Sequence, residues 1–255
     1  MAARLRTIAE YEVASPPSLG EQRRFWDRWN STYRFRDRLD EFMERQRDTA
    51  VSIAQSTGLH GARILDVGCG TGWLGNALLP FGQVFGTDLS EAAVAEGMRR
   101  YPRVRMVCGD FSKVELPGPY DFVVMVDSLT SMHEMSVGLR RVAMLLGQGR
   151  TFLLMTPNRW IWRRRSSLEP RGHGQFMAWP TAAEYKALLE PWFVVDRWSS
   201  IVPGGDRGLV WWVENRWVRR GMARLVGDRR WWRLLEALGL GRELVIVCTR
   251  NEKPA

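Results

Sequence analysis

The sequence predicts an α/β protein in which helices cover both faces of a mainly parallel sheet. From position 63 onward, short apolar runs alternate with stretches of helical periodicity, and strands connected through helices run parallel. The runs are apolar almost throughout, which is typical of strands that are buried on both faces. They read RILDVG, VFGTDL, VRMVCGD, DFVVMVD and TFLLMTP.

The elements around these runs follow from the same periodicity. TGWLGNALLPF, SEAAVAEGMRRY and SVGLRRVAMLLGQG predict helices between the strands, and Ser90 with Glu91 gives the second of them an N-cap and a first-turn acid. Aromatic and apolar residues at helical spacing between Glu21 and Thr57 predict two earlier helices. Two more strands, WFVVDRWSSIV and ELVIVCTRN, flank a helical stretch that is rich in Trp and Arg.

The composition excludes several classes of protein. With 45% apolar and 25% charged residues, the chain is an ordinary globular sequence and neither disordered nor fibrous. No apolar run approaches the ~20 residues that span a bilayer, and the N-terminus lacks the apolar centre of a signal peptide, so we expect a cytoplasmic protein. The three cysteines form no C-x-x-C pair, which argues against a zinc site, and no metal is expected.

The stretch ILDVGCGTGWLG, residues 64–75, carries the strongest functional signal. An apolar strand runs directly into four glycines. Glycines at a strand-to-helix turn let the backbone approach a ligand closely, and the following helix presents its first amides to that ligand. Gly70, Gly72 and Gly75 also satisfy the G-x-G-x-x-G pattern of dinucleotide-binding proteins. The loop therefore predicts a nucleotide ligand, but alone it leaves the ligand class open.

Acidic residues around the loop favour one class. Asp66 lies inside the first strand, Asp88 ends the second run, and Asp110 and Phe111 close the third. With these residues, ILDVGCGTG followed by GTDLS, CGDF and DFVVMVDSL makes the stretch 64–158 resemble class I S-adenosylmethionine-dependent methyltransferases. The resemblance implies a Rossmann-like, doubly wound, seven-stranded and mainly parallel sheet with an antiparallel last strand. It also implies S-adenosylmethionine as the cofactor.

The resemblance also implies how the chain is divided. Residues 1–60 would form an N-terminal helical lid over the cofactor. Residues 61–255 would form the methyltransferase catalytic domain, in which a helical insert at about 205–241 caps the substrate.

The cofactor site implied by the resemblance lies at the ends of the first four strands. Its residues are Asp66, Gly68, Cys69, Gly70, Asp88, Leu89, Asp110, Phe111, Asp127 and Ser128. S-adenosylmethionine carries a ribose diol, an adenine, an amino acid end and a sulfonium cation, so its site needs carboxylates more than lysines. Asp88 can accept both ribose hydroxyls as a charge-assisted pair, and Asp110 can accept from the adenine amino group.

The other residues of this set would hold the remaining parts of the cofactor. The Phe111 amide would donate to the adenine ring, and Leu89 would pack on a face of that ring. Residues 68–70 would pass under the methionine part, where a Cβ at either glycine would clash. Asp66 would orient the loop or meet the methionine amino group. The last two residues of the set follow the fourth strand and would lie beside the transferred methyl.

One histidine is the candidate catalytic base. Methyl transfer from a sulfonium depends on positioning and requires no metal, but a hydroxyl acceptor must also lose its proton. His133 follows the fourth strand at the carboxyl edge of the sheet, where open α/β folds bind their ligands. His173, after the fifth strand, is the second candidate. His60 precedes the first strand, at the opposite edge, and is expected to be structural.

The acceptor is expected to be a small or lipid-like molecule that is methylated at a hydroxyl oxygen. The chain lacks the (N/D)PP(Y/F) signature with which amine methylases hold a planar nitrogen. A looser resemblance in FWDRWN and TPNRW points to small-molecule tailoring methyltransferases of bacteria. A non-catalytic or regulatory S-adenosylmethionine-binding protein and an RNA methyltransferase are the alternatives. An NAD-dependent oxidoreductase is disfavoured because no Tyr-x-x-x-Lys pair is present.

The later part of the chain is basic and aromatic. Residues 150–255 carry the whole net charge of +9 and ten of the thirteen tryptophans. Interleaved Arg and Trp beside a cofactor site fit a bulky apolar acceptor with an acidic group, a membrane surface or RNA. Nucleic acid is the least favoured, because acids are mixed with the arginines and no RNA-binding module is present. The expected partners are a small-molecule or lipid-like substrate and, through this segment, a peripheral membrane contact.

Overall fold

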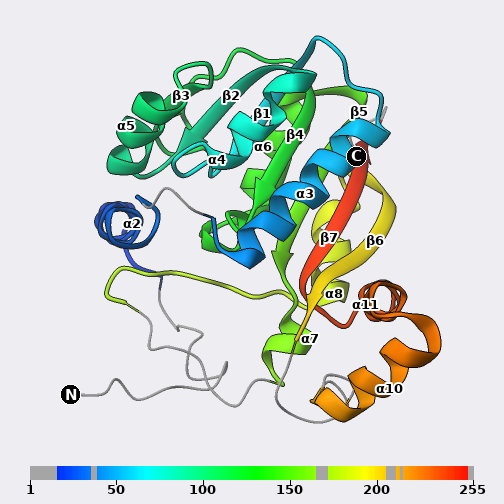
Figure 1. Cartoon of the computed structure of the whole chain (residues 1–255). Helices are drawn as coiled ribbons and strands as arrows, with labels where there is room; N and C mark the ends of the chain where they lie inside the picture. The colour runs from blue at the N-terminus through cyan, green and yellow to red at the C-terminus, as the bar shows by residue number, and fades with distance from the viewer. Residues whose placement is uncertain (1–15, 36–38, 165–171, 205–210, 213–214, 252–255) are drawn as a thin grey trace.

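A seven-stranded sheet forms the centre of the protein (Figure 1). The computed structural model describes residues 16–35, 39–164, 172–204, 211–212 and 215–251. Within these residues the strand order is β3-β2-β1-β4-β5-β7-β6. The strands are β1 (Ala62–Val67), β2 (Gly82–Asp88), β3 (Arg105–Cys108), β4 (Tyr120–Val126), β5 (Leu146–Pro157), β6 (Phe193–Pro203) and β7 (Gly241–Arg250).

The strand directions confirm the predicted fold class. Strands β1 to β5 pair in parallel, whereas β7 lies between β5 and β6 and runs antiparallel to both. The chain first proceeds from β1 to β2 and β3 on one side, and then to β4 and β5 on the other. The order therefore reverses between β1 and β4, and open α/β sheets bind ligands outside the carboxyl ends of their strands at such a point.

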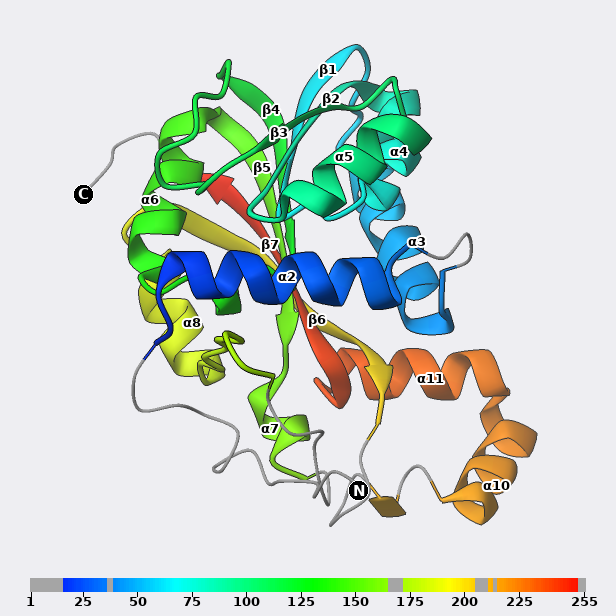
Figure 2. The ribbon, with the colours of Figure 1, turned by 90° about the vertical axis from the view of Figure 1, so that its left-hand side faces the viewer.

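Helices cover both faces of the sheet (Figures 1 and 2). They are α2 (Leu19–Tyr33), α3 (Glu41–Ser56), α4 (Trp73–Leu78), α5 (Glu91–Arg100), α6 (Met135–Leu145), α7 (Arg159–Trp162), α8 (Ala182–Leu189), α10 (Arg216–Val226) and α11 (Asp228–Ala237). Ile53 of α3 and Leu74 of α4 belong to one buried cluster with residues of β1 and β2. Leu139 of α6 and Tyr185 of α8 belong to a second buried cluster with other residues of the strands. The sheet thus has an apolar layer on each side.

Strand β5 begins earlier than the sequence indicates. The apolar run predicts a strand from Thr151, but the strand starts at Leu146, directly after α6. Leu146 is fully buried and pairs with Tyr120 across a register shift. Residues 147–150 extend past the buried part of the sheet and are partly or fully exposed. Because no packing selects apolar side chains there, the extension has no hydrophobic pattern.

Helix α2 crosses the carboxyl edge of the sheet (Figure 2). Its first turn is a capping box in which Ser18 Oγ accepts from the Glu21 amide and the Glu21 carboxylate accepts from the Ser18 amide. Asp27, in the middle of α2, accepts from Ser90 Oγ at 2.8 Å and from the Ala92 amide at 3.2 Å. These bonds join α2 to the start of α5 and fix it above the strand ends.

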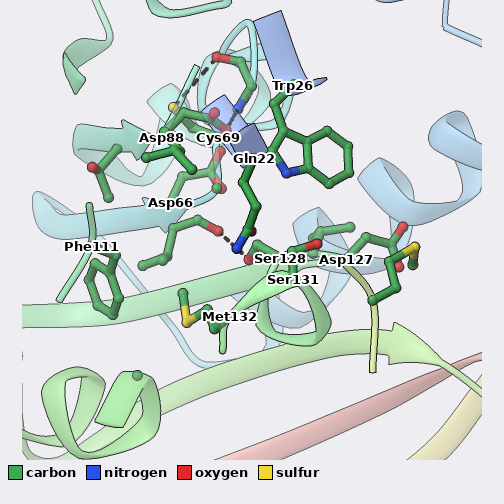
Figure 3. A pocket seen from close by; sticks show the side chains of 18 of the residues that line it. Gln22, Trp26, Asp66, Cys69, Asp88, Phe111, Asp127, Ser128, Ser131 and Met132 are labelled. Carbon is green, nitrogen blue, oxygen red and sulfur yellow. Dashed lines mark hydrogen bonds between the residues drawn. The ribbon is translucent and has the colours of Figure 1, made fainter. Parts of the chain in front are cut away.

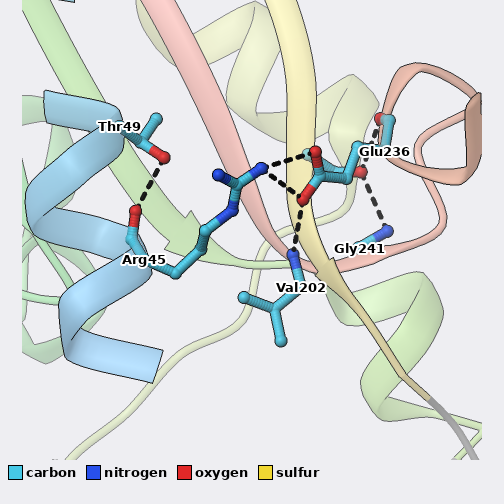
Figure 4. Close-up of polar contacts among 6 residues, drawn as sticks. Arg45, Thr49, Val202, Glu236 and Gly241 are labelled. Atoms are coloured by element: carbon cyan, nitrogen blue, oxygen red, sulfur yellow. Dashed lines mark hydrogen bonds and ion pairs between the residues drawn. The ribbon is translucent and has the colours of Figure 1, made fainter. Parts of the chain in front are cut away.

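Helix α11 is joined to β6 and α3 by polar contacts (Figure 4). Arg45 of α3 donates to both carboxylate oxygens of Glu236, at 2.9 and 2.8 Å, and the Val202 amide donates to the same carboxylate. The buried Ser200 hydroxyl donates to the Glu236 carbonyl and accepts from the Gly241 amide, both at 2.8 Å. The helical segment before β7 is therefore held against the edge of the sheet.

None of the helices in the described part of the chain is long and apolar enough to cross a bilayer.

Candidate functional site

A pocket of about 1100 Å³ lies between α2 and the carboxyl ends of the strands (Figure 3). The structure brings all ten residues of the predicted cofactor set, together with His133, to the lining of this one pocket. From α2, Gln22 and Trp26 contribute to the opposite wall (Figure 3). The volume is at the upper end of the range for small-molecule sites, so it has room for more than one compact ligand.

The glycine loop forms one wall of the pocket, between β1 and α4. The amides of Gly68 and Cys69 both donate to the Thr87 carbonyl, at 2.7 and 3.0 Å, which fixes the loop beside the end of β2. Gly68 has φ +76°, and a Cβ at this position would lie 2.3 Å from the Ser128 Cβ. Only glycine fits there without moving the segment after β4. Ser128 is itself held by a 2.7 Å bond to the Val67 carbonyl.

Asp88 ends β2 and faces this loop. Its Oδ2 accepts from the Gly70 amide and its Oδ1 accepts from the Ser90 amide, both at 2.8 Å. Burial raises the pKa of Asp88, although these two amides act in the opposite sense. Each carboxylate oxygen has a second lone-pair direction. The carboxylate can therefore accept two more hydrogen bonds from a ligand in the pocket.

Asp66 lies deeper, under the glycine loop, and is 2% exposed. Its Oδ2 has no hydrogen-bond partner within the described residues. Burial, together with the charge of Asp88, raises the pKa of Asp66 to about 7, while a bond from the Gly75 amide lowers it. A buried carboxylate oxygen without a partner is costly. A cationic or donor group of a ligand would satisfy it.

The segment after β3 lines the pocket beyond Asp88. The Asp110 carboxylate accepts from the amide and the hydroxyl of Ser112, at 2.9 and 2.8 Å. Phe111 is 7% exposed and belongs to the core. Leu89 follows Asp88 on the same wall. Cys69 is also buried, and burial raises the pKa of its thiol, so the thiol stays protonated.

The histidines lie in three different places. His133 lines the pocket just before α6, where its ring meets Phe176 edge-on at 5.2 Å and contacts the Gln22 amide. His173 does not line the pocket; its Nε2 lies 3.8 Å from a Glu21 carboxylate oxygen. His60 precedes β1 at the amino edge of the sheet, as its position in the sequence indicates.

Several lining residues have no counterpart in the sequence-based set. Gln46 of α3 and Glu243 of β7 meet beside Asp127, and Trp162 and Trp179 add an aromatic wall. Helical periodicity alone does not show that Gln46 faces a pocket. The sequence does contain an indication that Glu243 is unusual, because it is a charged residue at the start of an apolar run.

The chain is similar to known methyltransferases over the part that runs from β1 to the beginning of β5. Residues 64–149 match the family model described as a methyltransferase domain. Over 101 residues, 39% of each chain, the sequence is 32% identical to a probable S-adenosylmethionine-dependent methyltransferase of Mycolicibacterium smegmatis. Over 115 residues it is 34% identical to the ubiquinone biosynthesis O-methyltransferase of Xanthomonas campestris, covering 42% of this chain and 48% of the relative. The chain thus spans less than half the length of these relatives.

A solved structure shows the same fold over nearly the whole chain. Magnesium protoporphyrin IX methyltransferase from Synechocystis PCC 6803, with bound S-adenosylmethionine, has a TM-score of 0.61 and 16% sequence identity. The match covers 94% of this chain and 100% of that one. At this level of identity the likeness shows a shared fold, and the family model adds the match to a methyltransferase domain over residues 64–149.

Proposed function

We propose that this protein, whose residues 64–149 match the family model of a methyltransferase domain, transfers a methyl group from S-adenosylmethionine to a hydroxyl oxygen of a small or lipid-like acceptor. The observation that carries the proposal is the carboxylate of Asp88, held by two backbone amides at the end of β2 and facing the glycine loop. A vicinal diol suits this carboxylate, because both of its oxygens can still accept.

The other residues of the pocket fit the same cofactor. The unpartnered Oδ2 of Asp66 would accept from the methionine amino group, and the glycine cradle at residues 68–70 would leave room for the methionine chain. Leu89 and Phe111 would border the adenine. When bound, the cofactor supplies an electrophilic methyl group on a sulfonium. The protein would supply orientation and exclude water from the reacting atoms.

Two observations support a hydroxyl acceptor. The ubiquinone biosynthesis relatives are O-methyltransferases by name, and the segment after β4 reads DSL where amine methylases carry (N/D)PP(Y/F). Trp29, Phe42 and Trp179 form an aromatic part of the pocket lining. Such a wall fits an apolar or aromatic acceptor.

Calorimetry with S-adenosylhomocysteine, and separately with NADH, tests the cofactor. We expect S-adenosylhomocysteine to bind in the micromolar range, about −8 kcal/mol, and NADH not to bind. Binding of NADH alone would contradict the proposal. Transfer of radiolabelled methyl from S-adenosylmethionine then separates an enzyme from a protein that only binds the cofactor.

Helix α10 supports a further proposal about the surface on which the protein would encounter its acceptor. Trp217 and Leu225 are 65% and 79% exposed, and Arg216, Arg220 and Arg224 are exposed on the same short helix. We propose that this helix rests on an anionic lipid surface, because interfacial helices combine an apolar face with basic residues.

Vesicle sedimentation tests the lipid contact. We expect binding to phosphatidylcholine vesicles that contain about 30% phosphatidylglycerol and weaker binding to pure phosphatidylcholine. Replacing the three arginines of α10 by glutamine should weaken binding more than tenfold, because each basic residue contributes about 1 kcal/mol near an anionic surface. Met144→Ala is the matched control, since Met144 is 71% exposed on α6. Equal binding to both kinds of vesicle would contradict the proposal.

A further inference from the structure

Three side chains form a buried bridge beside the end of β4. The Nε2 of Gln46, in α3, donates to Asp127 Oδ2 at 2.9 Å and to Glu243 Oε2 at 2.8 Å. Gln46 and Glu243 are 2% and 1% exposed. A single amide nitrogen thus uses both of its protons to hold two carboxyl groups, one after β4 and one on β7. All three residues line the pocket.

Two features set this bridge apart from an ordinary structural cluster. Glu243 Oε1 has no hydrogen-bond partner among the described residues, although a buried oxygen without a partner costs about 1–3 kcal/mol. Asp127 has φ +54°, a left-handed conformation that is uncommon outside glycine, although aspartate adopts it more readily than most residues. A donor group of a ligand in the pocket would satisfy Glu243 Oε1.

The two carboxyl groups share one negative charge near neutral pH. Burial raises the pKa of Asp127 to about 6, against the opposing effects of the Gln46 hydrogen bond and the Arg34 charge. Burial and the charge of Asp127 raise the pKa of Glu243 further, while Arg242 lowers it. Two nearby carboxyls cannot both ionise cheaply. Asp127 therefore ionises more readily than Glu243.

Other groups around the bridge do not replace Asp127 in this role. Tyr185 of α8 bonds to Thr156, and burial raises the pKa of its hydroxyl well above the ordinary value, so it stays neutral. His133 is exposed, its Nε2 contacts the side-chain amide of Gln22, and its ring meets Phe176 edge-on. Among the described residues around the bridge, Asp127 combines the carboxyl that ionises more readily, an orientation held by Gln46 and a place directly after β4.

We propose that Asp127 is the general base of the methyl transfer and that the acceptor is a phenolic hydroxyl. This inference rests on the proposed function of the pocket. The proton of the hydroxyl passes to Asp127 as the acceptor oxygen forms its bond to the methyl carbon. The electron pair of the broken S–C bond stays on the sulfur, which becomes neutral. Gln46 is a positioning residue that holds the Asp127 carboxylate.

The pKa of the acceptor hydroxyl distinguishes a phenol from an aliphatic alcohol as the acceptor. A phenol such as that of tyrosine has a pKa of about 10, whereas an aliphatic hydroxyl resembles water, at about 15.7. A carboxylate base can assist loss of the first proton far more readily than the second. Trp26, Phe42 and Trp162 line the same pocket and offer flat apolar surfaces to an aromatic ring.

Two matched probes test the proposal with radiolabelled S-adenosylmethionine. 4-Hydroxybenzoate carries a phenol, and 4-(hydroxymethyl)benzoate carries an aliphatic hydroxyl on the same ring. We expect the phenol to be methylated at least about 100-fold faster. Asp127→Asn should lower kcat by about 100-fold or more, the usual effect of losing a general base, while S-adenosylhomocysteine still binds. His133→Ala should cost less than about tenfold, because the proposal assigns the proton to Asp127 and not to His133.

The pH profile separates catalysis from a merely structural role. The wild-type rate should fall as the pH drops through about 6, where Asp127 takes up its proton. Gln46→Leu removes a hydrogen bond that stabilises the ionised form of Asp127, so the fall in rate at low pH should occur about one pH unit higher than in the wild type. If Gln46→Leu loses rate but the pH of this fall does not change, Gln46 is only structural and its assigned role is contradicted.

Other outcomes would overturn the assignment itself. An undiminished rate in Asp127→Asn would exclude Asp127 as the base, and faster methylation of the aliphatic probe would exclude a phenolic acceptor. Methylation of neither probe by a protein that binds S-adenosylhomocysteine would also exclude it. Failure of the wild type to bind S-adenosylhomocysteine would instead refute the proposed function, so the two failures are distinguishable.

Discussion

Asp88→Ala is expected to weaken binding of S-adenosylhomocysteine by at least about 100-fold, because it removes two charge-assisted hydrogen bonds worth about 1.5 kcal/mol or more each. The same change frees the amides of Gly70 and Ser90, which the carboxylate now holds at 2.8 Å. The glycine loop then loses a support in addition to its ligand contact. Isothermal calorimetry on the purified variant measures the loss.

Two further variants make this result interpretable. Asp88→Asn keeps the shape of the side chain and one accepting oxygen, but its amide nitrogen cannot accept from a backbone amide or a hydroxyl, so it should bind more weakly than the wild type and more tightly than the alanine variant. Asp48→Ala removes an exposed carboxylate on α3 whose partner is the neighbouring Arg47, and its affinity should equal that of the wild type. Wild-type affinity in both Asp88 variants would remove Asp88 from the cofactor site.

Much of the fold could be predicted because the strands are buried on both faces. Ile64, Phe122 and Leu153 are fully buried, and each stands in a run whose apolar character marks it as a strand. The beginning of β5 is exposed, and its residues form no apolar run that would identify it as a strand. Packing selects the side chains of a central strand, but it does not select those of a strand end that projects into solvent.

The two halves of the pocket differed in how well they could be predicted. The residues predicted to bind the cofactor follow one continuous order along the chain, from the glycine loop through Asp88 and Asp110 to Asp127, at the ends of successive strands. The bridge from Gln46 to Glu243 joins residues 197 positions apart. Their meeting depends on β7 being inserted between β5 and β6 and on α3 packing across β4 and β6, which local patterns do not encode.

Asp66→Asn is expected to stabilise the ligand-free protein above neutral pH. The pKa of Asp66 is raised to about 7 by burial and by Asp88, while an unfolded chain has an aspartate pKa of about 3.9. Between these values the folded state holds a proton that the unfolded state has released, so the free energy of unfolding falls as the pH rises. The stabilising contribution of protonated Asp66 is complete below about pH 4 and is lost by about pH 7.

An asparagine at position 66 stays neutral throughout this window. The variant should therefore gain stability relative to the wild type between pH 4 and 7, by up to about 4 kcal/mol for a shift of this size if no water enters the site. Urea unfolding at pH 5, 6, 7 and 8 measures the difference. Since Asp88 is present in both proteins, the comparison isolates Asp66. A difference that does not change with pH would contradict the assignment of the raised pKa to this group.

The same substitution should act in the opposite direction on the ligand. If Asp66 Oδ2 accepts from the methionine amino group, Asp66→Asn replaces an ionised acceptor and should weaken S-adenosylhomocysteine binding by about tenfold or more. The wild type thus keeps a carboxylate that destabilises the empty fold and becomes favourable when a cation pairs with it. A variant that is more stable yet binds more weakly would show that the buried Asp66 carboxylate lowers the stability of the ligand-free protein but strengthens ligand binding. A variant that is more stable and binds equally well would place the amino group elsewhere.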